Sequence, residues 1–163
     1  MDELRVDGYI PGGIGRIVEL HGTYYSRHWN FGLYFERKVA TEMAAFLGRR
    51  DDRRNGFWLA IVNDAIIGGI AIDGIHAAEQ GAHLRWFIVD PAFRGRRVGT
   101  RLLHTALDFC RHCAYRRVYL WTFAGLDAAR HLYEASGFVL CKEHVDRQWG
   151  TPVREQMFEL LYD

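Results

Sequence analysis

The sequence predicts a single α/β domain in which helices flank a mixed central sheet. The chain has 163 residues, 49% of them apolar and 25% charged, so we treat residues 1–163 as one ordinary globular domain. In the second half, segments with apolar residues at helical spacing alternate with short apolar runs bounded by Gly, Asn, Asp or Pro. This alternation favours a mixed sheet covered by helices.

The first half predicts two helices and a hairpin. Residues 8–15 form a Gly-rich turn before a helix whose apolar face carries Ile14, Ile17, Val18, His21, Tyr24 and Tyr25. A second helix ends at Gly48, for which we expect a left-handed cap, and its apolar face carries Phe35, Val39, Met43, Phe46 and Leu47. Apolar runs over 57–62 and 66–73 around Asn63-Asp64-Ala65 predict an antiparallel hairpin.

The second half predicts strands and helices in turn. A strand over 83–89 is stopped by Asp90-Pro91, and an amphipathic helix follows over 98–114. The remaining expected elements are a strand over 117–122, a helix over 127–136 closed by Gly137, and strands over 138–142 and 153–161.

Charge and composition exclude several classes of protein. The chain has 21 Lys+Arg and 20 Asp+Glu, a balance that argues against a nucleic-acid or membrane partner. Its longest apolar stretches, 57–62 and 65–72, are far below the ~20 residues that span a bilayer. The N-terminus lacks the apolar core of a signal peptide. The chain has only three cysteines, an odd number that does not suit a disulfide framework. We therefore expect a cytoplasmic protein.

The cysteines also argue against a metal centre. Cys110 and Cys113 form a C-x-x-C inside a predicted helix, away from the helix N-terminus that would lower a thiol pKa, and only Cys141 remains as a further thiol. A zinc site requires four ligands in paired clusters, and the eight histidines are scattered singly. We expect structural thiols and no metal.

Residues 89–100 carry the clearest chemical pattern. A strand runs through Asp90-Pro91 into a Gly/Arg-rich loop that opens directly into a helix, where free backbone N–H groups and the helix dipole favour phosphate. Four arginines stand within eight residues: Arg94, Arg96, Arg97 and Arg101. Cations at a helix N-terminus are unfavourable because the helix dipole is positive there, unless an anion neutralises them. The loop therefore predicts an anion site. Its spacing matches neither the P-loop nor the dinucleotide pattern.

Two motifs in this order resemble the acyl-CoA-binding core of the GNAT superfamily of N-acetyltransferases. They are Val89-Asp90-Pro91-x-x-Arg94-Gly95-x-x-Val98-Gly99 and Ala129-x-x-Leu132-Tyr133-Glu134-x-x-Gly137-Phe138, and the resemblance covers about residues 57–140. It implies a mostly antiparallel sheet with helices on both faces. Residues 9–15 and Trp121-Thr122 are also similar to the acetyltransferase half of bacterial MarR-GNAT fusion proteins, although this chain has no winged-helix segment.

The resemblance implies acetyl-CoA as co-substrate. In the family, the loop wraps the CoA pyrophosphate, and the main chain of the preceding strand forms hydrogen bonds with the pantetheine arm. The arm enters where that strand diverges from the strand over 118–122. A free amide at this opening can donate a hydrogen bond to the thioester carbonyl. The cofactor-binding residues expected on this basis are Phe87, Ile88, Val89, Arg94, Gly95, Arg96, Arg97, Val98, Gly99 and Thr100. The chain departs from the family at Leu126, often Asn, and at Arg97, usually Gly, whose side chain must point away from the pyrophosphate unless the loop opens.

Two residues match the family's catalytic positions. Tyr133 matches the tyrosine that protonates the departing thiolate, although its place on an apolar helix stripe is equally typical of a core residue. An amine acceptor arrives mostly protonated and needs a base, and His83 occupies the position where many members carry Glu. The alternatives for the base are Glu36, Asp73, Glu79 and Glu155.

The implied activity is acetyl transfer to a primary amine by direct attack in a ternary complex. The acceptor is a small-molecule or peptide amine of unknown identity, and a homodimer is a possible assembly. A cluster of aromatic residues stands at the junction of the first two helices: Tyr24, Tyr25, His28, Trp29, Phe31 and Tyr34. Together with the loop near Trp149, these residues select the acceptor amine, or else they belong to the core or to a dimer interface. The alternative is a non-catalytic acyl-CoA-binding module that signals to a protein partner. A third hypothesis, nucleic-acid binding through the arginines, is disfavoured by the balanced charge.

Overall fold

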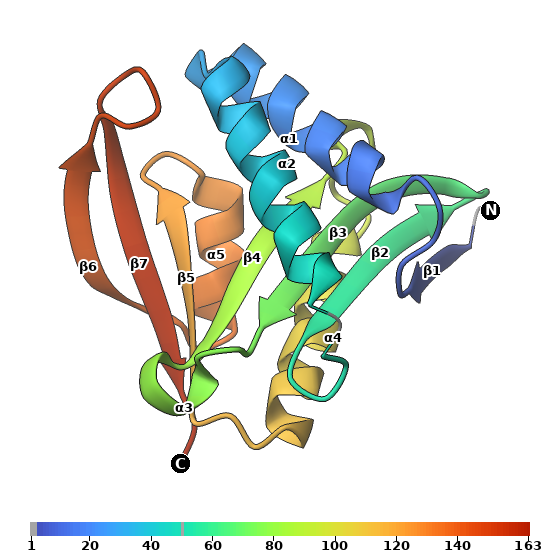
Figure 1. Cartoon of the computed structure of the whole chain (residues 1–163), viewed down its shortest axis with the longest axis vertical. Coiled ribbons are helices and arrows are strands. Elements are labelled where there is room, and N and C mark those ends of the chain that lie inside the picture. The colour runs from blue at the N-terminus through green and yellow to red at the C-terminus, as the bar shows by residue number, and fades with distance from the viewer. Residues whose placement is uncertain (1–2, 50) are drawn as a thin grey trace.

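The computed structural model describes residues 3–49 and 51–163, which fold around a seven-stranded sheet (Figure 1). The strand order is β1-β2-β3-β4-β5-β7-β6, and neighbours are antiparallel except for the parallel pair β4 and β5. The elements in chain order are β1 (Leu4–Asp7), α1 (Gly13–Trp29), α2 (Leu33–Gly48), β2 (Gly56–Val62), β3 (Ala65–Asp73), α3 (Ala77–Gln80), β4 (Ala82–Val89), a 3-10 turn (Pro91–Phe93), α4 (Val98–His112), β5 (Arg117–Phe123), α5 (Asp127–Ala135), β6 (Val139–Asp146) and β7 (Val153–Leu161).

Helices cover both faces of the sheet, which confirms the predicted fold class. In Figure 1, α1 and α2 lie across one face, where Ile17, Met43 and Ile88 belong to one buried cluster. On the opposite face, Leu102 of α4 and Tyr133 of α5 belong to a second cluster. The sheet therefore separates two cores, and successive residues of β4 contribute to one or the other.

The predicted helices and strands are present, with differences at their ends. The four-residue strand β1 and the short helix α3 were not expected, because neither is long enough to show a period. β6 continues to Asp146 rather than ending at Lys142, since its last residues pair with β7 from Glu143↔Gln156 to Asp146↔Val153. Tertiary pairing defines these elements.

Gly48 corrects one expectation. It is the last residue of α2, but its φ is not positive, so the predicted left-handed cap is wrong. The following Arg49 is right-handed, with φ −75°, and its N–H donates to the Phe46 carbonyl at 3.2 Å. Its guanidinium binds both carboxylate oxygens of Asp73 at 3.0 and 2.6 Å, so a bidentate ion pair fixes this helix end to β3.

Candidate active site

Strands β4 and β5 diverge after a short parallel contact. Within the described chain, they pair at Ala82↔Val118 and His83↔Tyr119, and the rest of each strand faces the other without ladder pairing. Backbone groups of both strands are thus left available along the opening. This is the splay that the sequence led us to expect, and it begins at His83.

A β-bulge in β4 lies beside this opening. Gly69 pairs with Ile88 and Ala71 with Arg85, so two residues of β4, Trp86 and Phe87, oppose one of β3. Trp86 has φ +51°, a left-handed conformation that costs about 1–2 kcal/mol for a residue with a side chain. The Arg85 guanidinium lies 4.2 Å from the Trp86 ring centroid and supports it. The bulge turns Phe87 toward α4 and α5 and Trp86 toward α1 and α2.

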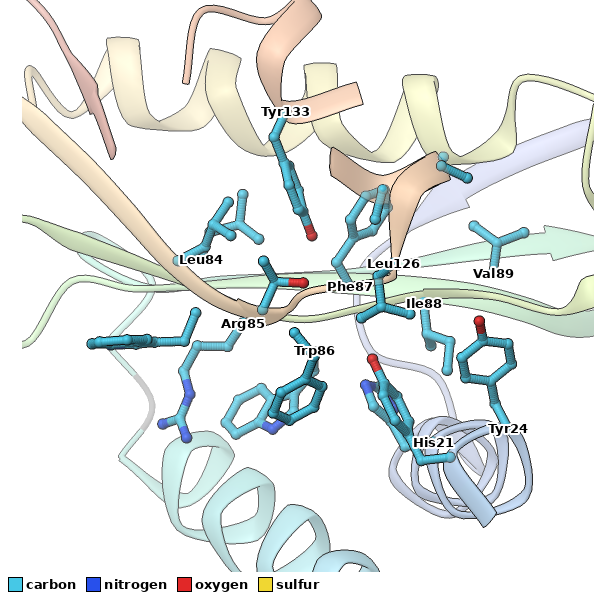
Figure 2. A pocket seen from close by; sticks show the side chains of 18 of the residues that line it. His21, Tyr24, Leu84, Arg85, Trp86, Phe87, Ile88, Val89, Leu126 and Tyr133 are labelled. Carbon is cyan, nitrogen blue, oxygen red and sulfur yellow. The ribbon is translucent and has the colours of Figure 1, made fainter. Parts of the chain in front are cut away.

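A cavity of about 1300 Å³ fills the splay and extends to both faces of the sheet. Figure 2 shows Tyr133 reaching in from one side and His21 and Tyr24 from α1 on the other. Nearly all the residues predicted to bind cofactor line it: Phe87, Ile88, Val89, Arg94, Gly95, Arg97, Val98, Gly99 and Thr100. Arg96 lies outside this lining, and its guanidinium stands 5.3 Å from the Phe93 ring centroid.

The turn and the Gly/Arg loop at the mouth of the cavity are held by contacts from α1. The Asp90 carboxylate accepts a hydrogen bond from the Ala92 N–H at 3.0 Å, and it forms an ion pair with Arg16 of α1 at 2.9 Å. The Arg94 guanidinium lies 5.1 Å from the Tyr24 ring centroid. The N–H groups of the first α4 turn have no partner within the helix and open toward the loop, which suits an anion.

Arg97 stands where the family pattern has glycine. It is the N-cap of α4, with φ +60° and ψ +20°, the left-handed conformation that a glycine would adopt there. Its side chain is exposed, and Arg97 also lines the cavity. Gly99 is the tighter position, because a Cβ there would lie 3.2 Å from Leu132 and 3.3 Å from Phe87. Arg101 is used elsewhere, since it donates to the Leu4 carbonyl at 2.6 Å.

Tyr133 is buried on α5 with its hydroxyl directed into the cavity (Figure 2). Its ring packs near Phe87, Phe138 and Phe158, with centroids 6.0, 5.8 and 6.3 Å away. Burial strongly raises the pKa of this hydroxyl, so it stays protonated at neutral pH. Tyr133 is therefore a core residue whose protonated hydroxyl faces the cavity.

His83 is half-buried, and it lines the cavity where the splay begins. Its ring stacks on Tyr119, with centroids 4.6 Å apart. Burial and the Arg85 charge, opposed by Asp73, lower the pKa of His83 to about 3. The imidazole is consequently neutral at pH 7, and it is a weak base because its conjugate acid is strong.

The four alternative bases occupy different environments. Glu36 and Glu79 are exposed and lie outside the cavity lining. Asp73 is bound by Arg49, which holds the pKa of this carboxyl low against the effect of burial. Glu155 of β7 is buried, and among these four residues it alone lines the cavity.

The aromatic residues near Trp149 form core and cavity wall together. Phe31 is 2% exposed and stacks on Trp149 with centroids 5.8 Å apart, which is core packing. Tyr24, Tyr25 and Trp149 also line the cavity. Phe31 therefore belongs to the core, whereas Tyr24, Tyr25 and Trp149 belong to the cavity wall, and selection of the acceptor stays a prediction.

Two further cavity residues, His144 and Asp146, were missed. The sequence placed them in a loop because β6 was expected to end at Lys142. The two residues stand two positions apart, so both side chains lie on one face of the extended strand, and this spacing is the signal that could have found them.

The thiol of Cys110 is unreactive, since burial raises its pKa to about 12.

Known proteins with this fold and arrangement identify the family. Residues 15–138 match the Acetyltransferase (GNAT) family. An uncharacterized N-acetyltransferase of Methanocaldococcus jannaschii is 30% identical over 122 residues, which are 71% of this chain and 53% of that protein, so the chain spans about half the length of this relative. The chain belongs to the GNAT acetyltransferase family.

Solved structures share the fold. A GNAT-family acetyltransferase of Staphylococcus aureus superposes with a TM-score of 0.77 at 18% identity, over 99% of this chain and 100% of that one. The structure of yncA from Salmonella typhimurium with its cofactor acetyl-CoA gives 0.77 at 15% identity, over 98% and 94%. Within residues 3–49 and 51–163, no helix has the length and apolar character to cross a membrane.

Proposed function

We propose that the protein transfers the acetyl group of acetyl-CoA to a primary amine on a small molecule or peptide. The observation that carries the proposal is the cavity in which the splayed strands, the first turn of α4 and the Tyr133 hydroxyl meet. The relative with acetyl-CoA bound has the same fold and supports the choice of cofactor. A cytoplasmic location, a homodimer, the absence of metal and a closer relation to MarR-fused acetyltransferases remain predictions from the sequence.

In this mechanism the chain binds the cofactor with backbone groups. The loop from Arg94 to Thr100 would hold the pyrophosphate, and the unpaired edge of β4 over Phe87 to Val89 would bond the pantetheine arm. Amide groups at the bulge supply hydrogen bonds for the thioester oxygen as negative charge develops on it. Orientation and oxyanion stabilisation are thus properties of the fold.

The acetyl transfer needs two proton movements. The neutral amine nitrogen attacks the thioester carbonyl carbon, so that a C–N bond forms and the C–S bond breaks, and the nitrogen releases one proton to solvent as the amide forms. Tyr133 gives its proton to the departing sulfur and regains one from solvent. His83, neutral at pH 7, can accept a hydrogen bond from the attacking amine.

The first experiment measures acetyl-CoA binding by calorimetry together with thermal unfolding. Saturation at about a hundred times Kd should stabilise the fold by roughly 2.7 kcal/mol, because a ligand that binds only the folded state shifts unfolding by mass action. Absence of binding to acetyl-CoA and CoA would refute the proposal.

Replacing Tyr133 by Phe separates an enzyme from a binding module. We expect the substitution to lower kcat by at least about 100-fold, since general acid catalysis contributes that much, while leaving the Kd of acetyl-CoA within twofold. Tyr9→Phe, at an exposed tyrosine, is the matched control. Equal turnover by Tyr133→Phe and wild type would remove Tyr133 from the mechanism, and absence of turnover in wild type would favour the binding module.

A further inference from the structure

Three side chains meet at the end of the cavity formed by the β6–β7 hairpin. His144 and Asp146 lie on one face of β6, and His144 stands directly opposite Glu155 of β7. Glu155 in turn pairs in register with Phe123 of β5, so these side chains share the sheet face covered by α1 and α2. All three line the same cavity as Tyr133.

Glu155 is held in one position by His144 and Trp149. One carboxylate oxygen lies 3.1 Å from His144 Nε2, and the other accepts a hydrogen bond from Trp149 Nε1 at 3.3 Å. The Glu155 side chain is 10% exposed, whereas the His144 side chain is 49% exposed. The pair therefore connects a buried carboxylate in the cavity with solvent.

The charges around Glu155 leave it without a permanent cation. Within the described chain, its ion-pair contact is with His144, and Asp146 adds a second carboxylate whose Oδ2 lies 3.9 Å from His144 Nε2. Lys38 of α2 also lines the cavity, and its ammonium lies 5.8 Å from the Trp149 ring centroid. Two carboxylates beside an aromatic wall make this end of the cavity suited to a ligand that brings its own positive charge.

We propose that Glu155 binds the ammonium group of the acceptor and removes its proton, which His144 then passes to solvent. The proposal rests on the acetyl transfer proposed above, and it names the acceptor class as a primary ammonium carried by an apolar or aromatic group. That group would lie against Phe35, Phe123 and Trp149, which line the same end of the cavity. Glu155 would be the catalytic base, and His144 and Asp146 positioning residues.

The proton balance is complete without another reactant. The N–H bond of the ammonium breaks as an O–H bond forms on Glu155, which leaves a neutral amine with a free electron pair for attack. The proton moves from the carboxyl to His144 Nε2 and then to water, so Glu155 returns to its anionic form. Burial and the neighbouring Asp146 raise the pKa of Glu155, which strengthens it as a base compared with an exposed glutamate.

The test compares Glu155→Gln with Glu143→Gln, a carboxylate on the same hairpin that binds Arg154 and Gln156 outside the cavity lining. The acceptors are 2-phenylethylamine, which is protonated at neutral pH, and aniline, which is not. We expect Glu155→Gln to lower kcat/KM for 2-phenylethylamine by at least about 100-fold and to lose the acid limb of its pH profile. Aniline acetylation should change less than threefold, and Glu143→Gln should match wild type.

A second variant and a binding measurement keep the outcomes separable. His144→Gln retains a donor near Glu155 but cannot accept a proton and pass it on, so we expect a smaller loss of kcat/KM, about tenfold. Acetyl-CoA Kd should stay within twofold in every variant. Absence of acetyl-CoA binding in wild type refutes the proposed function itself. If acetyl-CoA binds but neither amine is acetylated, or if Glu155→Gln retains the wild-type pH profile, the assignment of Glu155 and of the acceptor class is overturned.

Discussion

Arg97 offers a direct test of how the loop at the start of α4 is built. Its left-handed backbone, φ +60°, costs about 1–2 kcal/mol for a residue with a Cβ. Glycine removes that cost but gains freedom in the unfolded chain, which offsets about 0.4–1 kcal/mol. Because both variants lack the guanidinium, comparing Arg97→Gly with Arg97→Ala isolates the backbone effect. We expect the free energy of unfolding of Arg97→Gly to be higher by roughly 1 kcal/mol.

Urea unfolding followed by tryptophan fluorescence measures this difference, and calorimetry with CoA measures its consequence for binding. Since the loop already has the backbone that glycine would adopt, the Kd of CoA should be the same for both variants within twofold. Each should bind up to about fivefold more weakly than wild type, because an exposed ion pair contributes at most about 1 kcal/mol. An Arg97→Ala protein as stable as Arg97→Gly would refute the strain, and tighter CoA binding by both would show that the side chain obstructs the loop.

Two further predictions concern stability. Burial lowers the pKa of His21 from 6.5 to about 4, so the unfolded state binds a proton that the folded state rejects, and stability falls as the pH drops through this window. The matched variant is His21→Asn, which keeps a donor for the Ile17 carbonyl. Between pH 7 and pH 4, the free energy of unfolding of wild type should fall by about 3 kcal/mol more than that of His21→Asn. If the free energies measured by urea unfolding fell equally with pH in both proteins, this prediction would be wrong. Gly68→Ala places a Cβ 2.7 Å from the Ile88 carbonyl oxygen and should destabilise by about 1–3 kcal/mol in thermal unfolding, whereas Gly15→Ala, with open space in α1, should stabilise by about 0.5–1 kcal/mol. Equal melting temperatures for these two variants would show that β3 and β4 yield at this contact.

The parts of the fold that the sequence predicted are those that repeat a local pattern. The helical period of Val98 to Ala114 and the positive-φ turn at Asn63-Asp64 are properties of a few consecutive residues. The bulge at Trp86 and the extension of β6 to Asp146 depend on partners far along the chain. Such features follow from pairing in the folded sheet, and no local pattern encodes them.

The same distinction applies to the candidate site. The Gly/Arg loop and Tyr133 stand in recognisable motifs, and the fold brings both to one cavity. His144 carries no motif, and its nearness to Glu155 depends on the register of the β6–β7 hairpin. The low pKa of His83 likewise arises from burial and from Arg85, which spacing in the sequence does not show.

The divergence of β4 and β5 has a consequence for how the molecule avoids association. Unpaired strand edges normally recruit strands from other chains, and proteins protect them with charges, bulges or covering segments. Here two such edges face each other in the middle of the sheet, screened by α1 and α2 on one side and by α4 and α5 on the other. A slender ligand can reach the free amide and carbonyl groups between them, whereas a foreign strand is excluded by the surrounding helices. The protein can thus keep an open hydrogen-bonding surface for binding without the aggregation hazard that an outer edge would carry.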